Sequence, residues 1–392
     1  IGITNIVYNV ANTAAQVDPG DKLYVCGTHT ANQMEIYQEN SPALPIEIDG
    51  GCPGDPGALA PTSNNFALYI EGSYYKIHGI DISRGNNGTV QINPDGAGGF
   101  TLVGGIELYD NRIHDGLHNT ALVFSYGTDN YFHHNYLYSG RGAGFYSQGK
   151  RNKFSYNQID NIDLVIGGDS VQLSTEMDGS VIEYNTSDRT TGIDLKACWT
   201  MSNTAVEGGL VILRGNRCIG RPTYTSFSGM YNETNLIAYG NYFYGGRNGM
   251  WCAVAAGRTC DLIGNVVVNP KERAIQTGGV GTLDRVLNNT VIGASIPSAI
   301  GISLGNPSVQ QARNNIISGF TVGVENQGGT GTLNSHNLFH NISVNNLTNN
   351  GVAGSPGAGS LLATDPLFLS SESYKLQVLS PARLVGVTYY GC

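Results

Sequence analysis

An asparagine that is followed two residues later by a mostly apolar residue returns at regular intervals along this chain. The positions are Asn111, Asn135, Asn157, Asn185, Asn216, Asn241, Asn265, Asn289, Asn315 and Asn337. The successive gaps are 24, 22, 28, 31, 25, 24, 24, 26 and 22 residues. Such a period is too short for repeats built from pairs of helices, and the chain lacks the leucine pattern of leucine-rich repeats. We therefore expect a solenoid whose repeats are single coils of short strands.

Each coil contains the same order of short segments. In the coil that closes at Asn216, Gly192–Lys196 is predicted as a first strand, Leu210–Gly215 as a second and Arg217–Ile219 as the start of a third. The first strands predicted in other coils are Leu122–Ser125, Phe145–Gln148, Val171–Ser174, Met250–Ala253, Ile275–Gly278 and Ile302–Gly305. Alternation directs Asp194 and Lys196 outward. The predicted fold class is all-β, a single-stranded right-handed parallel β-helix of about ten coils with an asparagine ladder.

The repeat also defines the expected domain organisation. Residues 1–100 fit the period less well and are predicted to form an N-terminal cap and irregular first coils. Residues 101–345 are the regular coils, and residues 346–392 are a C-terminal cap. We expect one β-helix domain over residues 1–392, and a monomer.

Composition excludes several classes of protein. Only 13% of the residues are charged and 54 are glycine, so a helical protein is not expected. A net charge of −9 argues against a nucleic-acid partner, and no apolar run is long enough for a membrane span. Cys26 and Cys52, Cys198 and Cys218, and Cys252 and Cys260 are close in sequence, which indicates disulfides and an oxidising compartment. The start at Ile1 suggests a secreted protein after signal-peptide removal.

The coil pattern over residues 65–345 resembles the pectate-lyase-like β-helix superfamily of extracellular polysaccharide lyases, hydrolases and epimerases. The segments Asp365–Phe368, Tyr374–Leu376 and Ser380–Ala382 are similar to the ends of secreted bacterial members. The resemblance implies the fold and the compartment. Because many activities share this scaffold, it implies the chemistry only loosely.

In such a solenoid the outward side chains of the first strands form a parallel rack that suits a carbohydrate. The rack is predicted to contain Val123, Ser125, Tyr146, Gln148, Gln172, Ser174, Asp194, Lys196, Trp251, Gln276 and Ser303. Aromatic faces stack on sugar rings, and amides bind hydroxyl groups. Arg141, Arg189, Arg247 and Arg273 precede first strands and are predicted to line the rack with a basic rim for uronate carboxylates.

Lys196 is the leading catalytic candidate. β-Elimination on an acidic sugar needs a base for the proton next to the carboxylate and a cation that stabilises the enolate-like charge. Lys196 with Arg189 or Arg247 is similar to the Lys/Arg pairs of the chondroitinase B and alginate-lyase types of β-helix enzyme. The protein is therefore predicted to be a lyase that acts on an acidic polysaccharide.

Calcium is the expected cofactor, since related lyases use it to neutralise the substrate carboxylate. The candidate ligands are Asp169, Glu176, Asp178 and Asp194. Compared with calcium-dependent relatives, Ser170 and Gln172 stand where further carboxylates are expected.

Two alternatives stay open. Asp169 and Asp194 could serve as the carboxylate pair of a glycoside hydrolase, although the Gly-His-Gly and Arg-x-Lys motifs of polygalacturonases do not appear in order. The other alternative is a carbohydrate-binding or surface protein without catalytic activity. An outward rack with aromatic side chains and no titratable cluster would favour the carbohydrate-binding protein, whereas the grouping of Asp169, Asp194, Lys196 and Arg189 favours the enzyme.

Overall fold

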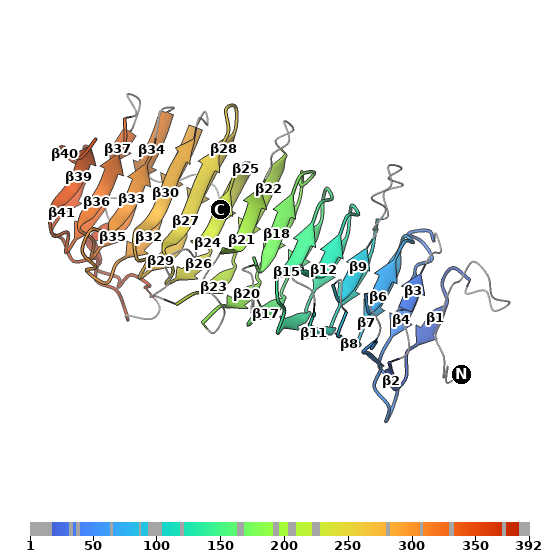
Figure 1. Ribbon diagram of the computed structural model, residues 1–392. Coiled ribbons are helices and arrows are strands. Elements are labelled where there is room, and N and C mark those ends of the chain that lie inside the picture. Colours follow the sequence, from blue (N-terminus) through green and yellow to red (C-terminus); the bar gives the residue numbers. More distant parts are fainter. Residues whose placement is uncertain are drawn as a thin grey trace. The chain divides into compact units, whose positions relative to one another are not determined.

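Short strands dominate the chain, and consecutive strands join three different sheets in turn. The computed structural model describes residues 18–30, 34–36, 40–62, 66–85, 88–92, 104–117, 121–162, 168–190, 196–202, 209–221, 228–279, 283–305, 309–328, 333–370 and 374–383. These residues belong to two units, Ile1–Ile212 and Leu213–Cys392, which we call unit 1 and unit 2. Within each unit, the strands of one sheet lie side by side, coil after coil (Figure 1).

Unit 1 contains three parallel sheets. Its sheet A consists of β1 (Lys22–Tyr24), β4 (Ile46–Asp49), β7 (Tyr75–His78), β10 (Glu107–Tyr109), β13 (Tyr131–His133), β16 (Lys153–Ser155) and β19 (Val181–Glu183). Sheet B consists of β2 (Thr28–His29), β5 (Ala58–Leu59), β8 (Asp81–Ser83), β11 (Arg112–His114), β14 (Tyr136–Tyr138), β17 (Gln158–Asp160) and β20 (Thr186–Asp188). Sheet C consists of β3 (Met34–Ile36), β6 (Leu68–Ile70), β9 (Val90–Ile92), β12 (Ala121–Ser125), β15 (Ala143–Ser147), β18 (Val171–Ser174) and β21 (Ala197–Ser202).

Unit 2 repeats this arrangement after β22 (Leu210–Arg214), which begins in unit 1. Its sheet A contains β25 (Asn235–Tyr239), β28 (Thr259–Ile263), β31 (Leu283–Leu287), β34 (Val309–Arg313) and β37 (Leu333–Ser335). Sheet B contains β23 (Arg217–Ile219), β26 (Tyr242–Tyr244), β29 (Val266–Val268), β32 (Thr290–Ile292), β35 (Ile316–Ser318), β38 (Leu338–His340) and β41 (Leu361–Leu362). Sheet C contains β24 (Ser228–Asn232), β27 (Asn248–Val254), β30 (Arg273–Gly279), β33 (Ile300–Leu304), β36 (Val322–Asn326), β39 (Asn345–Asn349) and the antiparallel β40 (Val352–Ala353). A short 3₁₀-helix, η1 (Pro381–Arg383), follows.

Both units are right-handed parallel β-helices, as the sequence predicts. Strand β18 coincides with the predicted Val171–Ser174. The prediction for Gly192–Lys196 is wrong in one respect, because the strand of that coil is Ala197–Ser202 and Lys196 precedes it. Residues 191–195 lie outside the described residues. No helix long and apolar enough to cross a membrane occurs among the described residues.

The predicted asparagines form a hydrogen-bonded ladder at the turn between sheets A and B. In unit 1, the Nδ2 of Asn135 donates to Oδ1 of Asn157 at 3.0 Å, and Asn157 donates likewise to Asn185 at 2.9 Å. The backbone N–H of Asn135 also donates to Oδ1 of Asn157. In unit 2 the same bonds join Asn216, Asn241, Asn265, Asn289, Asn315 and Asn337. Each coil therefore closes at the same turn.

The residue before each ladder asparagine has a positive φ. These residues are Asp110, His134, Tyr156, Tyr184, Gly215, Gly240, Gly264, Asn288, Asn314 and His336. The left-handed conformation costs a residue with a side chain about 1–2 kcal/mol, and Gly264 or Gly240 avoids that cost. Where aromatic residues take this position, their rings stack, as Tyr156 does on Tyr184 at a centroid distance of 5.1 Å. The stacking offsets part of the backbone strain.

Alternation fills each coil with apolar side chains. In unit 1, the rings of Phe132, Phe154 and Phe145 lie inside the coils, and Phe132 stacks on Phe154 at 5.0 Å. Sheet B contributes the buried side chains of Ile113, Leu137 and Ile159 to the same interior. The carboxyl group of Asp284 also lies in the interior of unit 2.

Asp284 points into unit 2 between Cys260 on β28 and Gln310 on β34. It is 2% exposed. Burial raises the pKa of Asp284 to about 7, and the negative charge of Asp261 contributes, although hydrogen bonds from Gln310, Thr277 and the backbone of Cys260 oppose the shift. The folded protein therefore holds a proton on this carboxyl group up to near-neutral pH.

We expect Asn157→Ala to destabilise the protein by about 2–4 kcal/mol, because it removes the acceptor that the backbone N–H and Nδ2 of the buried Asn135 share, and a donor to the carbonyl of Phe132. Denaturant unfolding measures this loss. Gln158→Ala, at the exposed neighbouring position, is the matched control. Equal unfolding midpoints for the two variants would show that the ladder contributes nothing.

We expect the free energy of unfolding of Asp284→Asn, relative to that of the wild-type protein, to increase as the pH rises. The folded pKa lies above the unfolded value of about 3.9, so the wild-type protein loses stability from about pH 4 through pH 7, by about 4 kcal/mol in total. The variant lacks this titration. Thermal unfolding at pH 5 and pH 8 measures the difference, with exposed Asp365→Asn as the control. A gap between variant and wild type that does not change with pH would contradict the prediction.

Candidate functional site

The outer face of sheet C in unit 1 carries a column of aromatic, amide and hydroxyl side chains. Residues in register from coil to coil are Tyr69, Gln91, Phe124, Tyr146, Gln172 and Thr200, which we call the unit 1 column. The rings of Phe124 and Tyr146 lie 5.5 Å apart. Gln148 donates from Nε2 to the hydroxyl of Tyr146 at 2.5 Å. The predicted positions of Tyr146, Gln148 and Gln172 therefore lie together on one partly exposed face.

The prediction that Val123 and Ser125 face outward is wrong. Both are buried, at 0% and 1% exposed, and Val123 stacks between Val90 and Phe145 in the core. The hydroxyl of Ser125 accepts a hydrogen bond from Asn130. Phe124 points outward instead, because the alternation in this strand is shifted by one residue from the predicted one.

Asp169 and Arg189 form a buried charged group beneath Lys196. Each is 1% exposed. Oδ1 of Asp169 accepts a hydrogen bond from the N–H of Ala197 at 2.8 Å, while Nη1 of Arg189 donates to the carbonyl of Ala197 at 3.3 Å. Nη2 of Arg189 donates to the carbonyl of Gly168 at 2.8 Å. The two side chains thus hold the residue that directly follows the exposed Lys196.

Burial raises the pKa of the Asp169 carboxyl group above its usual value, while the Ala197 N–H, the Thr200 hydroxyl and the charges of Lys196 and Arg189 oppose the shift. Asp194, predicted to accompany Asp169 and Lys196, lies outside the described residues. Both Asp169 and Arg189 are buried, and both contact Ala197, the residue that follows Lys196.

The four arginines of the predicted basic rim differ in their exposure and in their partners. In unit 1, Arg141 is exposed and donates from Nη1 to the carbonyl of Leu117 at 3.0 Å, whereas Arg189 is buried. In unit 2, Arg247 and Arg273 lie on either side of Glu272, with nitrogen–oxygen distances of 2.8 and 3.7 Å. Two cations share one carboxylate there, which leaves a net positive charge beside β27 and β30.

Unit 2 has its own column on the outer face of sheet C. In register are Tyr231, Trp251, Gln276, Ser303 and Glu325, which we call the unit 2 column. Trp251 meets Tyr231 edge to face, with ring centroids 5.1 Å apart. Burial and the hydrogen bond to Glu233 raise the pKa of Tyr231. Beside this column, a side chain at Gly278 would meet nothing within 4 Å, so the backbone next to Gln276 is uncovered.

The predicted calcium ligands do not form a cluster among the described residues. Asp169 is buried before β18, while Glu176 and Asp178 follow its end. Glu176 lies 3.9 Å from the ammonium group of Lys150, and Asp178 accepts a hydrogen bond from the N–H of Leu210. Asp194, the fourth predicted ligand, lies outside the described residues. Calcium stays a prediction.

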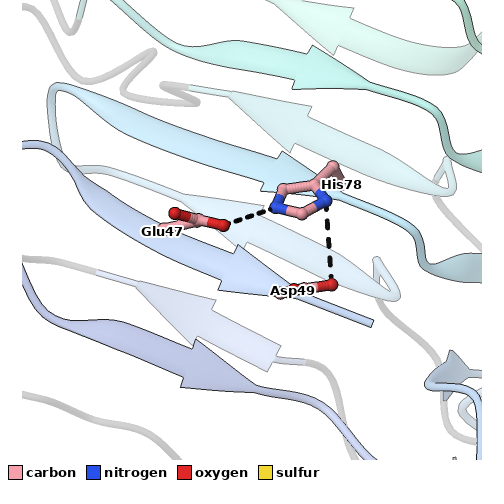
Figure 2. A group of neighbouring side chains, drawn as sticks. All are labelled: Glu47, Asp49 and His78. Atoms are coloured by element: carbon pink, nitrogen blue, oxygen red, sulfur yellow. Dashed lines mark hydrogen bonds and ion pairs between the residues drawn. The ribbon is translucent and has the colours of Figure 1, made fainter. Parts of the chain in front are cut away.

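The sequence analysis missed a group on the outer face of sheet A in unit 1. Glu47 and Asp49 on β4 and His78 on β7 offer donor atoms within 4.8 Å of one another. Figure 2 shows the imidazole of His78 with one nitrogen toward Glu47 and the other toward Asp49. It is the one group of three or more His, Cys, Asp or Glu side chains within metal-binding reach in the part of the chain that the structure describes.

No protein-family model and no curated protein matches the sequence. Among solved structures, the chain is similar to an alginate lyase from Paenibacillus sp. str. FPU-7, at 15% identity over 74% of this chain and 92% of the other, with a TM-score of 0.45. It is also similar to a PL6 family polysaccharide lyase from Pseudopedobacter saltans, at 14% identity over 95% of each chain and a TM-score of 0.42.

Likeness at this level carries no argument about activity. The fold assignment rests instead on the three parallel sheets and the asparagine ladder of each unit. They identify the right-handed parallel β-helix that the sequence pattern predicts.

Proposed function

We propose that the protein is a secreted polysaccharide lyase that cleaves a uronate-containing glycan by β-elimination on the outer face of sheet C in unit 1. The observation that carries the proposal is the unit 1 column. Phe124 and Tyr146 offer rings for stacking on sugars, while Gln148 and Gln172 offer amides for hydroxyl groups. Successive coils are about 4.8 Å apart, so the column presents a regular series of contacts along a polymer.

Preference for an acidic glycan is supported by the cations at the edge of this face. Arg141 and Lys196 are both exposed. Arg141 makes no ion pair with any residue that the structure describes, and its guanidinium has donors left for a carboxylate. The protein as a whole has a net charge of −9, so these cations are local exceptions that favour a uronate.

Lys196 is the proposed base. It would take the proton next to the uronate carboxylate, after which the glycosidic C–O bond breaks and leaves a double bond in the new end sugar. The departing oxygen would take a proton from water or from the Lys196 ammonium that the first step forms. Arg189 is a positioning residue in this scheme, because it is buried and acts through the carbonyl of Ala197. Asp169 holds the other side of the same residue through its N–H. No step in this scheme requires calcium.

Secretion is supported by the disulfides. Cys26 is bonded to Cys52, and Cys252 to Cys260. Cys198 in unit 1 and Cys218 in unit 2 are each disulfide-bonded as well. Disulfides of this number are typical of proteins that function in an oxidising compartment.

Two other functions differ in what they need from the structure. A hydrolase that uses Asp169 would need a carboxyl group open to the glycosidic oxygen, and Asp169 is 1% exposed. Carbohydrate binding without catalysis is favoured by the unit 2 column, where Trp251 and Tyr231 form an aromatic platform.

We expect Lys196→Ala to lower kcat/KM by about 10²–10⁴-fold, because it removes the base while an exposed side chain contributes little to the fold. The assay is absorbance near 235 nm during incubation with alginate, pectate and chondroitin. Lys76→Ala is the control, since Lys76 is exposed on sheet A, where it pairs with Glu107.

The outcomes separate the functions. Unchanged turnover by a folded Lys196→Ala protein would remove the proposed base. New reducing ends without a rise at 235 nm would replace the lyase with a hydrolase. Binding to a polymer without either product would support a carbohydrate-binding protein.

A further inference from the structure

We propose that Glu47, Asp49 and His78 form a binding site for a divalent transition-metal ion, with zinc as the best match. The site lies on sheet A and is independent of the proposed lyase activity. Figure 2 shows the three side chains converging from two neighbouring coils.

The donors are close and are fixed by regular strands. Oε1 of Glu47 lies 2.9 Å from Nε2 of His78, and Oδ1 of Asp49 lies 3.7 Å from Nδ1. Strands β4 and β7 pair in parallel, with Asp49 directly opposite His78. Ligands around one zinc ion are about 3–3.5 Å apart, given metal–ligand distances near 2.0–2.2 Å. In the structure the two carboxylates approach opposite nitrogens of the His78 ring, so an ion would bind one of these nitrogens, with one donor atom of each residue within 4.8 Å of the others.

Glycines leave room next to Oδ1 of Asp49 that a side chain would fill. A side chain at Gly51 would place its Cβ 2.8 Å from Oδ1 of Asp49, and one at Gly79 would reach within 3.5 Å of the same oxygen. Gly79 also has a φ of +69°, which disfavours other residues. The N–H of Gly51 donates to Oδ1 at 2.7 Å and so fixes the carboxylate.

The position between the carboxylates already holds a cation. The ammonium group of Lys22 lies 2.7 Å from Oε1 of Glu47 and 2.7 Å from Oδ2 of Asp49. Two carboxylates therefore face one ammonium group, whose single charge can neutralise only one of them.

A divalent ion matches the charge and the ligand atoms of Glu47, Asp49 and His78 better than the Lys22 ammonium group does. It supplies the second positive charge and coordinates an imidazole nitrogen directly, whereas an ammonium group can only donate a hydrogen bond to that nitrogen. One imidazole and two carboxylates suit zinc or manganese, whereas calcium prefers an all-oxygen shell of six to eight ligands. Lys22 is partly exposed and is free to turn into solvent when the ion binds.

The same sheet contains a natural control. Glu107 on β10 and His133 on β13 repeat the diagonal of Glu47 and His78, with an oxygen–nitrogen distance of 3.0 Å. At the position that corresponds to Asp49, this second group has Tyr109, whose ring stacks on His133. The second group therefore has one carboxylate fewer and should not bind the ion.

The test is isothermal titration of the full chain with zinc chloride, and with calcium chloride for comparison. We expect one zinc ion per chain at this site. His78→Gln and Asp49→Asn should each weaken zinc binding by at least about tenfold, while His133→Gln should leave it unchanged. Lys22→Met should tighten zinc binding by about tenfold, because the competing charge is removed. Circular dichroism of each variant verifies the fold.

Tighter binding in Lys22→Met distinguishes a metal site from a simple network of ion pairs. Absence of zinc binding in both the wild-type protein and Lys22→Met would overturn the proposal. Zinc binding that persists unchanged in both His78→Gln and Asp49→Asn would also overturn it, since the ion would then lie elsewhere.

Discussion

The vertical hydrogen bonding between coils is the constraint on which the rest of each unit depends. The Oδ1 of a ladder asparagine accepts from both the side chain and the backbone of the asparagine in the preceding coil, as Asn157 does from Asn135. Its Nδ2 also satisfies a carbonyl of that coil, in this case the carbonyl of Phe132. Because these groups are buried, a coil that closed elsewhere would leave them without partners. The ladder therefore fixes the turn of each coil that contains a ladder asparagine.

Fixed turns give each unit its outward columns. Once the strands are in register, side chains two residues apart form parallel columns on each outer face, and like positions are repeated at every coil. On sheet C of unit 1 this produces a row of rings and amides, with Tyr146 and Gln172 directly opposite each other. On sheet A it produces charged and aromatic pairs, among them Glu47 and His78. The same geometry thus creates one face suited to a polymer and another suited to a cation.

The repeat was predictable because its signal is periodic and local. The ladder positions, strand β18 and the outward positions of Tyr146, Trp251 and Gln276 all follow from spacing and alternation. Single-residue shifts were not predictable. The choice between Val123 and Phe124 as the outward residue depends on register with Val90 and Phe145, which one strand does not reveal. Strand β21 begins after Lys196 because Asp169 and Arg189, distant in sequence, hold Ala197 there.

The group at Glu47, Asp49 and His78 was missed because its residues come from the first coils, where the asparagine pattern is absent. A usable signal exists in hindsight. The segments Glu47-Ile-Asp49 and Lys76-Ile-His78 share the polar-apolar-polar pattern of the later second strands, such as Lys153–Ser155. Aligning these triplets places Asp49 opposite His78 without reference to the ladder. The diagonal contact between Glu47 and His78 then follows from the stacking of adjacent coils.

The central functional claim is that an acidic glycan binds along the outer face of sheet C in unit 1. Hydrogen–deuterium exchange of the Lys196→Ala protein with saturating uronate oligosaccharide tests it most directly. The account predicts slower exchange in the turns around β15 and β18, at residues 140–151 and 168–179, and no change at residues 75–79 and 107–110 of sheet A. Slower exchange on sheet A alone would contradict it.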